Sequence, residues 1–258
     1  MIVDVNVYLS RWPFRRLPCD ELPRLIERLK KCDVGQAWVG SFDGLFHRDV
    51  GGVNARLAED CARAGREVLV PFGTVNPALP DWEEDLRRCH EQYQMPGIRL
   101  HPNYHGYTLA DPVAEALFSA AAERRMIVQL APRMEDTRTQ HRLMQVADLD
   151  LKPLPALVAK FPRLRLVLLN SLRPAREAVP LLKFENVSFD IAMLEGVGGI
   201  EKLLRDTKLP VERALFGSHL PLYNLEAAIL KLRESELTPA QREALTQANA
   251  RRILKPAS

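Results

Sequence analysis

The chain has 258 residues, of which 47% are hydrophobic and 27% are charged, and its formal net charge is +3. This composition is typical of a folded globular protein, and it lacks the concentrated basic surface of a nucleic-acid-binding protein. No apolar run approaches the ~20 residues that a membrane helix requires. Met1 leads directly into an apolar segment, without the two-part pattern of a signal peptide. We therefore expect one domain over residues 1–258, with no nucleic-acid or membrane partner.

The four cysteines are widely spaced and form no CxxC pair. Such spacing is typical of reduced, buried thiols rather than of a disulfide framework or a zinc site, so we expect a cytoplasmic protein. The cysteines are Cys19, Cys32, Cys61 and Cys89.

Strand-like and helix-like segments alternate along the whole chain. Eight strands at this spacing predict an α/β fold with a parallel sheet closed into a (β/α)8 TIM barrel. An open doubly wound sheet is disfavoured, because no GxGxxG or GxxxxGK[ST] motif follows any strand. The predicted strands are Ile2–Tyr8, Gln36–Phe42, Val68–Val75, Gly97–His101, Met126–Ala131, Leu164–Asn170, Val187–Met193 and Ala214–Ser218. The predicted helices are Glu21–Lys31, Val53–Ala64, Trp82–Gln92, Pro112–Arg124, Leu154–Lys160, Arg173–Leu182, Ile200–Thr207, Leu225–Glu234 and Pro239–Leu254.

Polar side chains gather where these strands end, which in a βα barrel is the face that carries function. Five of the six histidines fall on this face, and only His90 lies inside a helix pattern. Histidine is the most common acid–base group and metal ligand near neutral pH. Each histidine taken alone is equally consistent with a loop or core residue bonded to a neighbour. The candidate catalytic residues are Tyr8, His101, Glu135, Asp136 and His219; the candidate substrate-binding residues are Asn6, Arg99, His105, Arg138, His141, Asn170 and Asp190.

Arg99 and His101 are two residues apart on a strand, so their side chains point to the same side of the sheet. A cation inside a barrel is costly unless it is paired, so we expect Arg99 to meet an anionic ligand or a carboxylate. An internal Arg–Asp pair that only supports the fold is the alternative. The candidate carboxylates are Asp4, Glu135, Asp136 and Asp190.

The sequence allows two roles for each of two loops. The segment from Met134 to His141 supplies either acid–base carboxylates and a substrate clamp, or an acidic helix start. The loop from Arg11 to Arg16 combines tryptophan, phenylalanine and three arginines. Because arginine suits carboxylates and phosphates, this loop is either a lid over an acidic or aromatic substrate or a surface contact.

Four short segments resemble the amidohydrolase superfamily, in particular its amidohydrolase 2 branch of TIM-barrel metal-dependent hydrolases and decarboxylases. The resemblance spans nearly the whole chain and implies a hydrolase or decarboxylase that sometimes forms homodimers. The segments are Ile2–Tyr8, Gly97–Pro102, Phe216–Pro221 and Asn249–Leu254.

The residues that hold the metal in the resembling family are replaced. Its first strand ends in a His-x-His pair where this chain has Asn6 and Tyr8, and Gln129-Leu130-Ala131 stands where a histidine is expected. Asn170 takes another histidine position, and His219 takes that of the aspartate that activates the metal-bound water. Because amides and phenols are poor zinc ligands, we expect no metal at the usual position and no required cofactor. A relocated zinc site would use His101, His105, His141 and His219.

Two hypotheses of function follow. In the first, the protein is a hydrolase, decarboxylase or lyase for a small anionic substrate, with His219 or His101 as base and Arg99 holding the anion. Tyr8 and Asn6 would then donate hydrogen bonds to a developing oxyanion. In the second, the protein is a non-catalytic descendant that binds a small acidic ligand or serves as an assembly partner.

Overall fold

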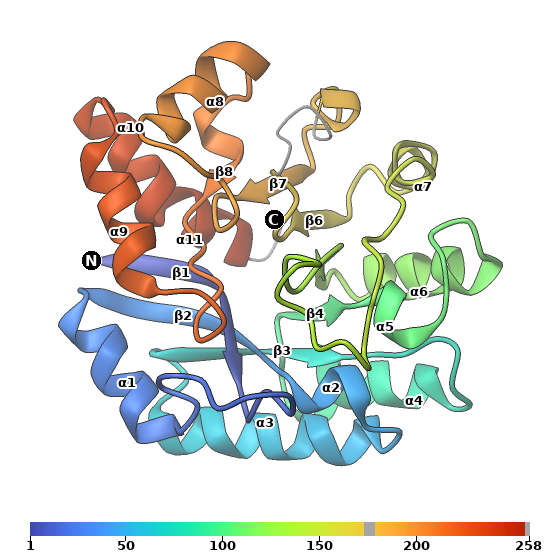
Figure 1. Cartoon of the computed structure of the whole chain (residues 1–258). Helices are drawn as coiled ribbons and strands as arrows, with labels where there is room; N and C mark the ends of the chain where they lie inside the picture. The colour runs from blue at the N-terminus through green and yellow to red at the C-terminus, as the bar shows by residue number, and fades with distance from the viewer. Residues whose placement is uncertain (173–178, 256–258) are drawn as a thin grey trace.

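The computed structural model describes residues 1–172 and 179–255. It contains one sheet of eight parallel strands in sequential order from β1 to β8, surrounded by helices (Figure 1). The predicted (β/α)8 barrel is therefore confirmed. The strands are β1 (Ile2–Leu9), β2 (Val34–Ser41), β3 (Leu69–Thr74), β4 (Gly97–Leu100), β5 (Ile127–Leu130), β6 (Arg165–Leu168), β7 (Val187–Asp190) and β8 (Ala214–Leu215).

The seam between β8 and β1 closes the barrel with few bonds, because β8 has only two residues. Val5 N donates to Phe216 O at 3.0 Å, and Tyr8 N donates to Leu220 O at 2.9 Å. The segment after β8 thus runs beside the C-terminal half of β1. Asn6 and Tyr8 consequently lie next to His219.

Local sequence signals explain where several helices begin. The Asp49 carboxylate accepts from Gly52 N, and the Asn224 side chain accepts from Glu226 N. Thr238 and Gln241 form a capping box, in which each side chain bonds the other residue's backbone. The helices are α1 (Leu22–Lys31), α2 (Asp43–Phe46), α3 (Val50–Ala64), α4 (Trp82–Arg87), α5 (Pro102–His105), α6 (Pro112–Glu123), α7 (Leu154–Lys160), α8 (Gly199–Thr207), α9 (Leu225–Glu234), α10 (Pro239–Glu243) and α11 (Asn249–Leu254), with π-helical turns η1 (Arg88–Gln92) and η4 (Ala244–Ala248) and a 3-10 turn η3 (Val211–Arg213).

The predicted helix Pro239–Leu254 is interrupted by η4 between α10 and α11. The carbonyl of Leu245 accepts from Phe216 N of the barrel at 3.0 Å. This tertiary bond, which no periodic pattern reveals, accompanies the wider turn. Most of the predicted helix Arg173–Leu182 lies outside the described residues.

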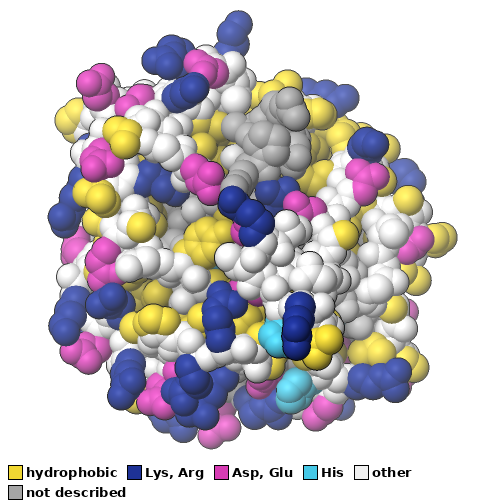
Figure 2. Space-filling model, in the orientation of Figure 1, with side chains coloured by type: hydrophobic (Ala, Val, Ile, Leu, Met, Phe, Trp, Pro, Cys, Tyr) yellow, Lys and Arg dark blue, Asp and Glu magenta, His cyan; other side chains and the backbone are white. Residues whose placement is uncertain are grey.

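Apolar side chains fill both layers of the barrel. The larger cluster joins the outward faces of the strands to the helices, with Leu25, Leu57 and Leu117 among its members. A second cluster, with Trp38 and Phe72, occupies the inside. All four cysteines are free thiols. Among the described residues, no helix has the length and apolarity that crossing a bilayer requires. Figure 2 shows basic and acidic side chains intermixed over one face, with hydrophobic side chains between them.

Candidate active site

Four buried side chains from strands distant in sequence form a hydrogen-bonded group at the C-terminal end of the barrel. The Asn6 amide donates to Asn170 Oδ1 at 2.8 Å and to Asp190 Oδ2 at 2.6 Å. Asn170 N donates to Asp190 Oδ1 at 2.8 Å. His219 Nδ1 lies 3.4 Å from both Asn6 Oδ1 and Asn170 Nδ2. We call Asn6, Asn170, Asp190 and His219 the amide–histidine cluster.

The hydrogen bonds of His219 fix its tautomer. Its Nε2 lies 2.7 Å from the carbonyl oxygen of Met134, which can only accept, so Nε2 carries the proton. The Nδ1 lone pair then faces the Asn170 amide. Burial lowers the pKa of His219 to about 4. The imidazole is therefore neutral at pH 7 and offers an unprotonated nitrogen.

Tyr8 and His101 form a second buried contact beside this cluster. Tyr8 Oη lies 2.9 Å from His101 Nε2, and the Tyr8 ring centroid is 5.6 Å from that of His219. Burial raises the pKa of Tyr8 to about 12. Burial, together with His105 and Arg99, lowers the pKa of His101 well below its usual range. At pH 7 this Tyr8–His101 pair is thus a neutral phenol against a neutral imidazole, suited to exchanging a proton with a third group.

Arg99 enters the barrel interior, where it meets no carboxylate of the described residues, so the expected pair with a carboxylate is wrong, while its binding of an anionic ligand stays a prediction. Its Nε donates to Gln129 Oε1 at 2.8 Å, and its terminal nitrogens donate to the backbone carbonyls of Val7, Val5 and Trp38 at 2.7, 3.3 and 3.0 Å. The guanidinium also lies 4.5 Å from the Tyr8 ring centroid. Because Arg99 is fully buried and each nitrogen is engaged, it organises the core in this conformation.

Two carboxylates lie fully buried below the mouth. Asp4 Oδ1 accepts from Asn6 N and Ser218 N at 3.0 Å each. Burial raises the pKa of Asp4 to about 7 and that of Asp190 to about 6. Gly217 is required beside Asp190, because an added Cβ would stand 2.5 Å from Asp190 Oδ2.

An aromatic roof covers the mouth. Trp12 from the loop after β1 packs against Phe14, Phe42 and Phe46 at centroid distances of 5.1–5.6 Å. Tyr104 extends the roof by an edge contact with Phe46. We call Trp12, Phe14, Phe42, Phe46 and Tyr104 the aromatic roof.

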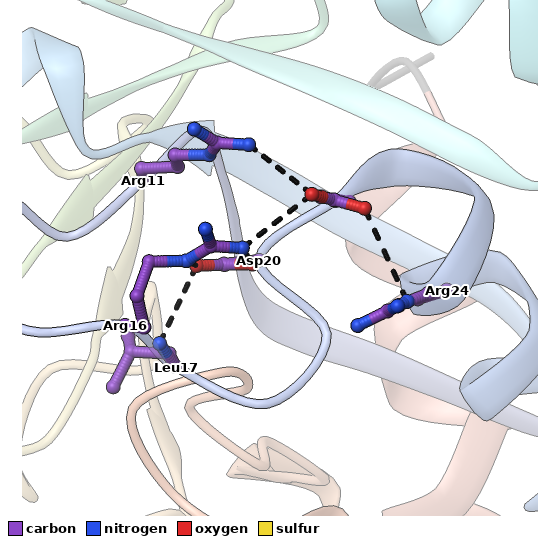
Figure 3. Close-up of polar contacts among 6 residues, drawn as sticks. Arg11, Arg16, Leu17, Asp20 and Arg24 are labelled. Carbon is purple, nitrogen blue, oxygen red and sulfur yellow. Dashed lines mark hydrogen bonds and ion pairs between the residues drawn. The ribbon is translucent and has the colours of Figure 1, made fainter.

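The loop after β1 is anchored at both its base and its tip. At the base, Arg16 holds the buried Asp20 carboxylate by two bonds of 2.6 and 3.0 Å (Figure 3). At the tip, Arg15 Nη1 lies 2.5 Å from Glu135 Oε1 of the loop after β5, and Phe14 stacks on His141. These contacts hold the loop against the loop after β5, and which of its two predicted roles the loop has stays a prediction.

Other residues predicted from the segment Met134–His141 lie further out. Glu135 pairs with Arg15 rather than orienting a histidine. Arg138 pairs with its neighbour Asp136, and its side chain is 77% exposed. His141 is exposed. The backbone carbonyl of Met134, which no side-chain pattern predicts, is the group of this segment that reaches His219.

Lys231 is a polar neighbour that the sequence does not reveal. It lies in an ordinary amphipathic helix, α9, yet its Nζ donates to Ile191 O at 2.8 Å and Ala192 O at 3.2 Å, just beyond Asp190. Burial lowers its pKa to about 8. Lys231 thereby ties α9 to the end of β7, which carries Asp190.

The side chains that stand at the metal-ligand positions of the family do not suit a divalent cation. Asn6 turns its NH₂ group toward Asn170 and Asp190, and Tyr8 is a neutral phenol. Within residues 1–172 and 179–255, no three His, Cys, Asp or Glu side chains come together as a metal-binding group. The relocated set does not assemble either: His101 and His105 are adjacent, with ring centroids 6.1 Å apart, but His141 stacks on Phe14 at the surface.

The whole fold is similar to solved TIM-barrel structures. 2,6-Dihydroxybenzoate decarboxylase from Rhizobium aligns with a TM-score of 0.78 at 13% identity, covering 98% of both chains. 5-Carboxyvanillate decarboxylase from Sphingomonas paucimobilis aligns with a TM-score of 0.75 at 14% identity, covering 99% of both. A TIM-barrel protein of uncharacterised function from Bordetella bronchiseptica gives 0.73 at 15% identity, covering 98% of both.

At these identities the likeness concerns the fold alone. Among curated proteins, none matches the chain in sequence. The amidohydrolase family model (Amidohydro_2), however, matches residues 35–255. The chain therefore belongs to the amidohydrolase family.

Proposed function

We propose that this protein is an acid–base enzyme of hydrolase or lyase type that acts on a small organic acid at the C-terminal mouth of the barrel without a divalent metal. The observation that carries the proposal is the Tyr8–His101 pair, with a phenol oxygen 2.9 Å from an imidazole nitrogen. Both groups are neutral near pH 7 for the physical reason that both are buried. General acid–base catalysis of this kind contributes ~10²–10⁴-fold in rate.

In this mechanism each residue has one task. His101 takes or returns a proton at Nε2, and the Tyr8 hydroxyl donates to the oxygen on which negative charge develops. His219 keeps its proton on Nε2, so its Nδ1 is a second acceptor beside Asn170. The Asn6 amide donates to Asn170 Oδ1 and Asp190 Oδ2, so it orients the Asn170 side chain whose NH₂ group faces this acceptor, rather than reacting itself.

An aromatic carboxylic acid is the proposed substrate class. The solved structures of similar fold include decarboxylases whose names specify dihydroxybenzoate and carboxyvanillate. The aromatic roof offers flat rings against which the planar ring of such a substrate can pack. Arg15 at the loop tip supplies a cation for the carboxylate of the substrate. The four free cysteines support a cytoplasmic location as part of the proposal.

The test is turnover by protein treated with a chelator. Dihydroxybenzoates, carboxyvanillate, and aromatic esters and lactones form the panel, with carbon dioxide release and product absorbance as readouts. We expect turnover that the chelator leaves unchanged and that Tyr8→Phe or His101→Asn lowers ~100-fold or more. Tyr93→Phe removes a phenol outside the barrel and serves as the matched control. Turnover that requires added zinc or manganese would contradict the proposal.

A non-catalytic ligand-binding protein is the second candidate. The observation in its favour is that Asn6, Tyr8, His101 and His219 are fully buried and bonded to protein groups, which leaves none exposed to solvent in this conformation. Calorimetric binding of an acid from the same panel, with no turnover of any compound, would favour this reading.

A further inference from the structure

Among the side chains that the structure describes, four buried polar atoms behind the Tyr8–His101 pair have no hydrogen-bond partner. They are Thr74 Oγ1, His101 Nδ1, His105 Nδ1 and Tyr107 Oη. Thr74, His101 and Tyr107 are at most 4% exposed, and His105 is partly buried. An unpaired buried polar atom costs ~1–3 kcal/mol, so native proteins rarely keep several. We call these four residues the β4 polar cluster.

These residues come from neighbouring positions at the ends of β3 and β4. The ring centroids of His101 and His105 are 6.1 Å apart, and those of His105 and Tyr107 are 6.5 Å apart. His105 Nε2 lies 2.8 Å from Gly44 O. A Cβ on Gly44 would stand 2.2 Å from Thr74 Oγ1, so the threonine hydroxyl lies against the same glycine. Thr74 Oγ1 and the His105 ring thus both lie against Gly44, and the rings of His101 and Tyr107 flank the His105 ring.

The chemistry of the four atoms selects their occupant. Because His105 Nε2 faces a carbonyl, it carries the ring proton, and His105 Nδ1 must be an acceptor that needs a donor. The hydroxyls of Thr74 and Tyr107 have protons that need acceptors. A carboxylate can accept from the hydroxyls but cannot donate to His105 Nδ1, and an ammonium group can donate to His105 Nδ1 but cannot accept the hydroxyl protons. Water both donates and accepts, and buried water typically makes about three such bonds.

We propose that the β4 polar cluster is a binding site for buried water that bonds His105 Nδ1 and the hydroxyls of Tyr107 and Thr74 and reaches His101 Nδ1. His101 then contacts a phenol through Nε2 and water through Nδ1. A proton accepted at Nε2 from the substrate side is matched by release of the Nδ1 proton to this water, which passes one of its own protons to His105 Nδ1. His101 is then neutral with its tautomer exchanged, and His105 holds the positive charge until the proton returns. This relay rests on the proposed function, whereas the water site itself does not.

The water site can be tested without a substrate. A crystal structure at about 1.2 Å or better should show ordered water within hydrogen-bond distance of His105 Nδ1 and one of the two hydroxyls. In solution, the ring protons of His101 and His105 should show cross-relaxation with water in nuclear magnetic resonance spectra. The double variant Thr74→Val, Tyr107→Phe should lose most of that signal, while Tyr93→Phe retains it.

Three results would overturn the proposal: a dry cluster in the crystal, hydroxyls and imidazoles paired directly with each other, or an equal water signal in the double variant. Each single variant is measured as well, so that a folding defect in the double variant leaves the comparison intact. Lack of turnover with a clear water signal would overturn the acid–base proposal alone. Turnover with a dry cluster would overturn the water site alone.

Discussion

Arg99 shows how a single residue can organise the inside of this barrel. Its guanidinium joins β4 to β1, β2 and β5 through Gln129 and three backbone carbonyls. Burial lowers the pKa of Arg99. The charge stays, because the guanidinium of arginine is not deprotonated inside proteins. The carbonyl dipoles and the Tyr8 ring compensate that charge.

Replacement of Arg99 by methionine should therefore destabilise the protein strongly. Arg99→Met keeps much of the side-chain length but removes the guanidinium that donates to Gln129 Oε1, Val7 O and Trp38 O, while Val5 O keeps a bond from Gln129 Nε2. Because each unsatisfied buried group costs ~1–3 kcal/mol, we expect a loss of at least about 3 kcal/mol in the free energy of unfolding. Urea denaturation measures it. Arg87→Met, which removes a surface guanidinium paired with Glu84, is the control and should change the stability far less, because exposed ion pairs contribute little. Equal losses would contradict this role for Arg99.

For single residues, the sequence predicts where a side chain lies in the barrel better than it predicts the hydrogen-bond partners of that side chain. The sites of Asn6, Tyr8, His101 and His219 at one end of the barrel follow from strand ends, which apolar runs mark well. The partners of Arg99 could not be predicted, because backbone carbonyls carry no sequence signal. The same holds for Met134 O opposite His219 and for Lys231, whose helix pattern looks like that of any surface lysine.

The loop between β1 and α1 carries part of the aromatic roof and is held at two separate places. Its base is tied by Arg16 and Asp20, while its tip depends on the Arg15–Glu135 ion pair and the Phe14–His141 stack. The contacts at the base of the loop and those at its tip can therefore be removed independently by mutation.

Removal of the tip contact should loosen the loop and leave the barrel intact. In Arg15→Ala we expect faster hydrogen–deuterium exchange, by at least several-fold, at the amides of residues 11–16. Arg11→Ala removes an exposed contact to Glu21 at the base and is the matched control. The readout is mass spectrometry of peptides from this loop. Exchange that is equally slow in both variants would show that the ion pair does not hold the tip.

Elements with regular periodicity are predicted closely, and the short ones are not. All eight strands overlap their predicted ranges, and helices such as Leu154–Lys160 and Leu225–Glu234 have the predicted bounds. The four-residue helices α2 and α5 lie in loops and are too short to show a period. Both carry parts of the mouth: Phe46 and His105.

At the scale of the whole molecule, two buried carboxylates make stability depend on pH. Burial raises the pKa of Asp4 from 3.8 to about 7, so the folded state holds this proton more tightly than the unfolded state does. The resulting stabilisation is complete below pH 3.8 and is lost as pH rises through about 7. Asp190, whose pKa is raised to about 6, contributes in the same direction.

Asp4→Asn should remove most of this dependence. Between pH 5 and pH 8, the stability of the variant relative to the natural chain should increase by roughly 3 kcal/mol, since each pKa unit corresponds to about 1.4 kcal/mol. Urea denaturation across this range measures the difference. Asp20→Asn is the control: Arg16 lowers the pKa of Asp20, so its contribution is already complete above pH 5 and its difference should stay constant. A constant difference for Asp4→Asn as well would contradict the assigned cause.

The arrangement around Arg99 also has a consequence for which contacts can form while the chain is still being synthesised. The cation and every oxygen that receives its hydrogen bonds come from the first 129 residues of the chain. Asn170, Asp190 and His219 all come later. A nascent chain that has emerged through β5 consequently contains every hydrogen-bond acceptor of the buried Arg99 cation and both members of the Tyr8–His101 pair, whereas the amide–histidine cluster cannot assemble until the final strand has left the ribosome.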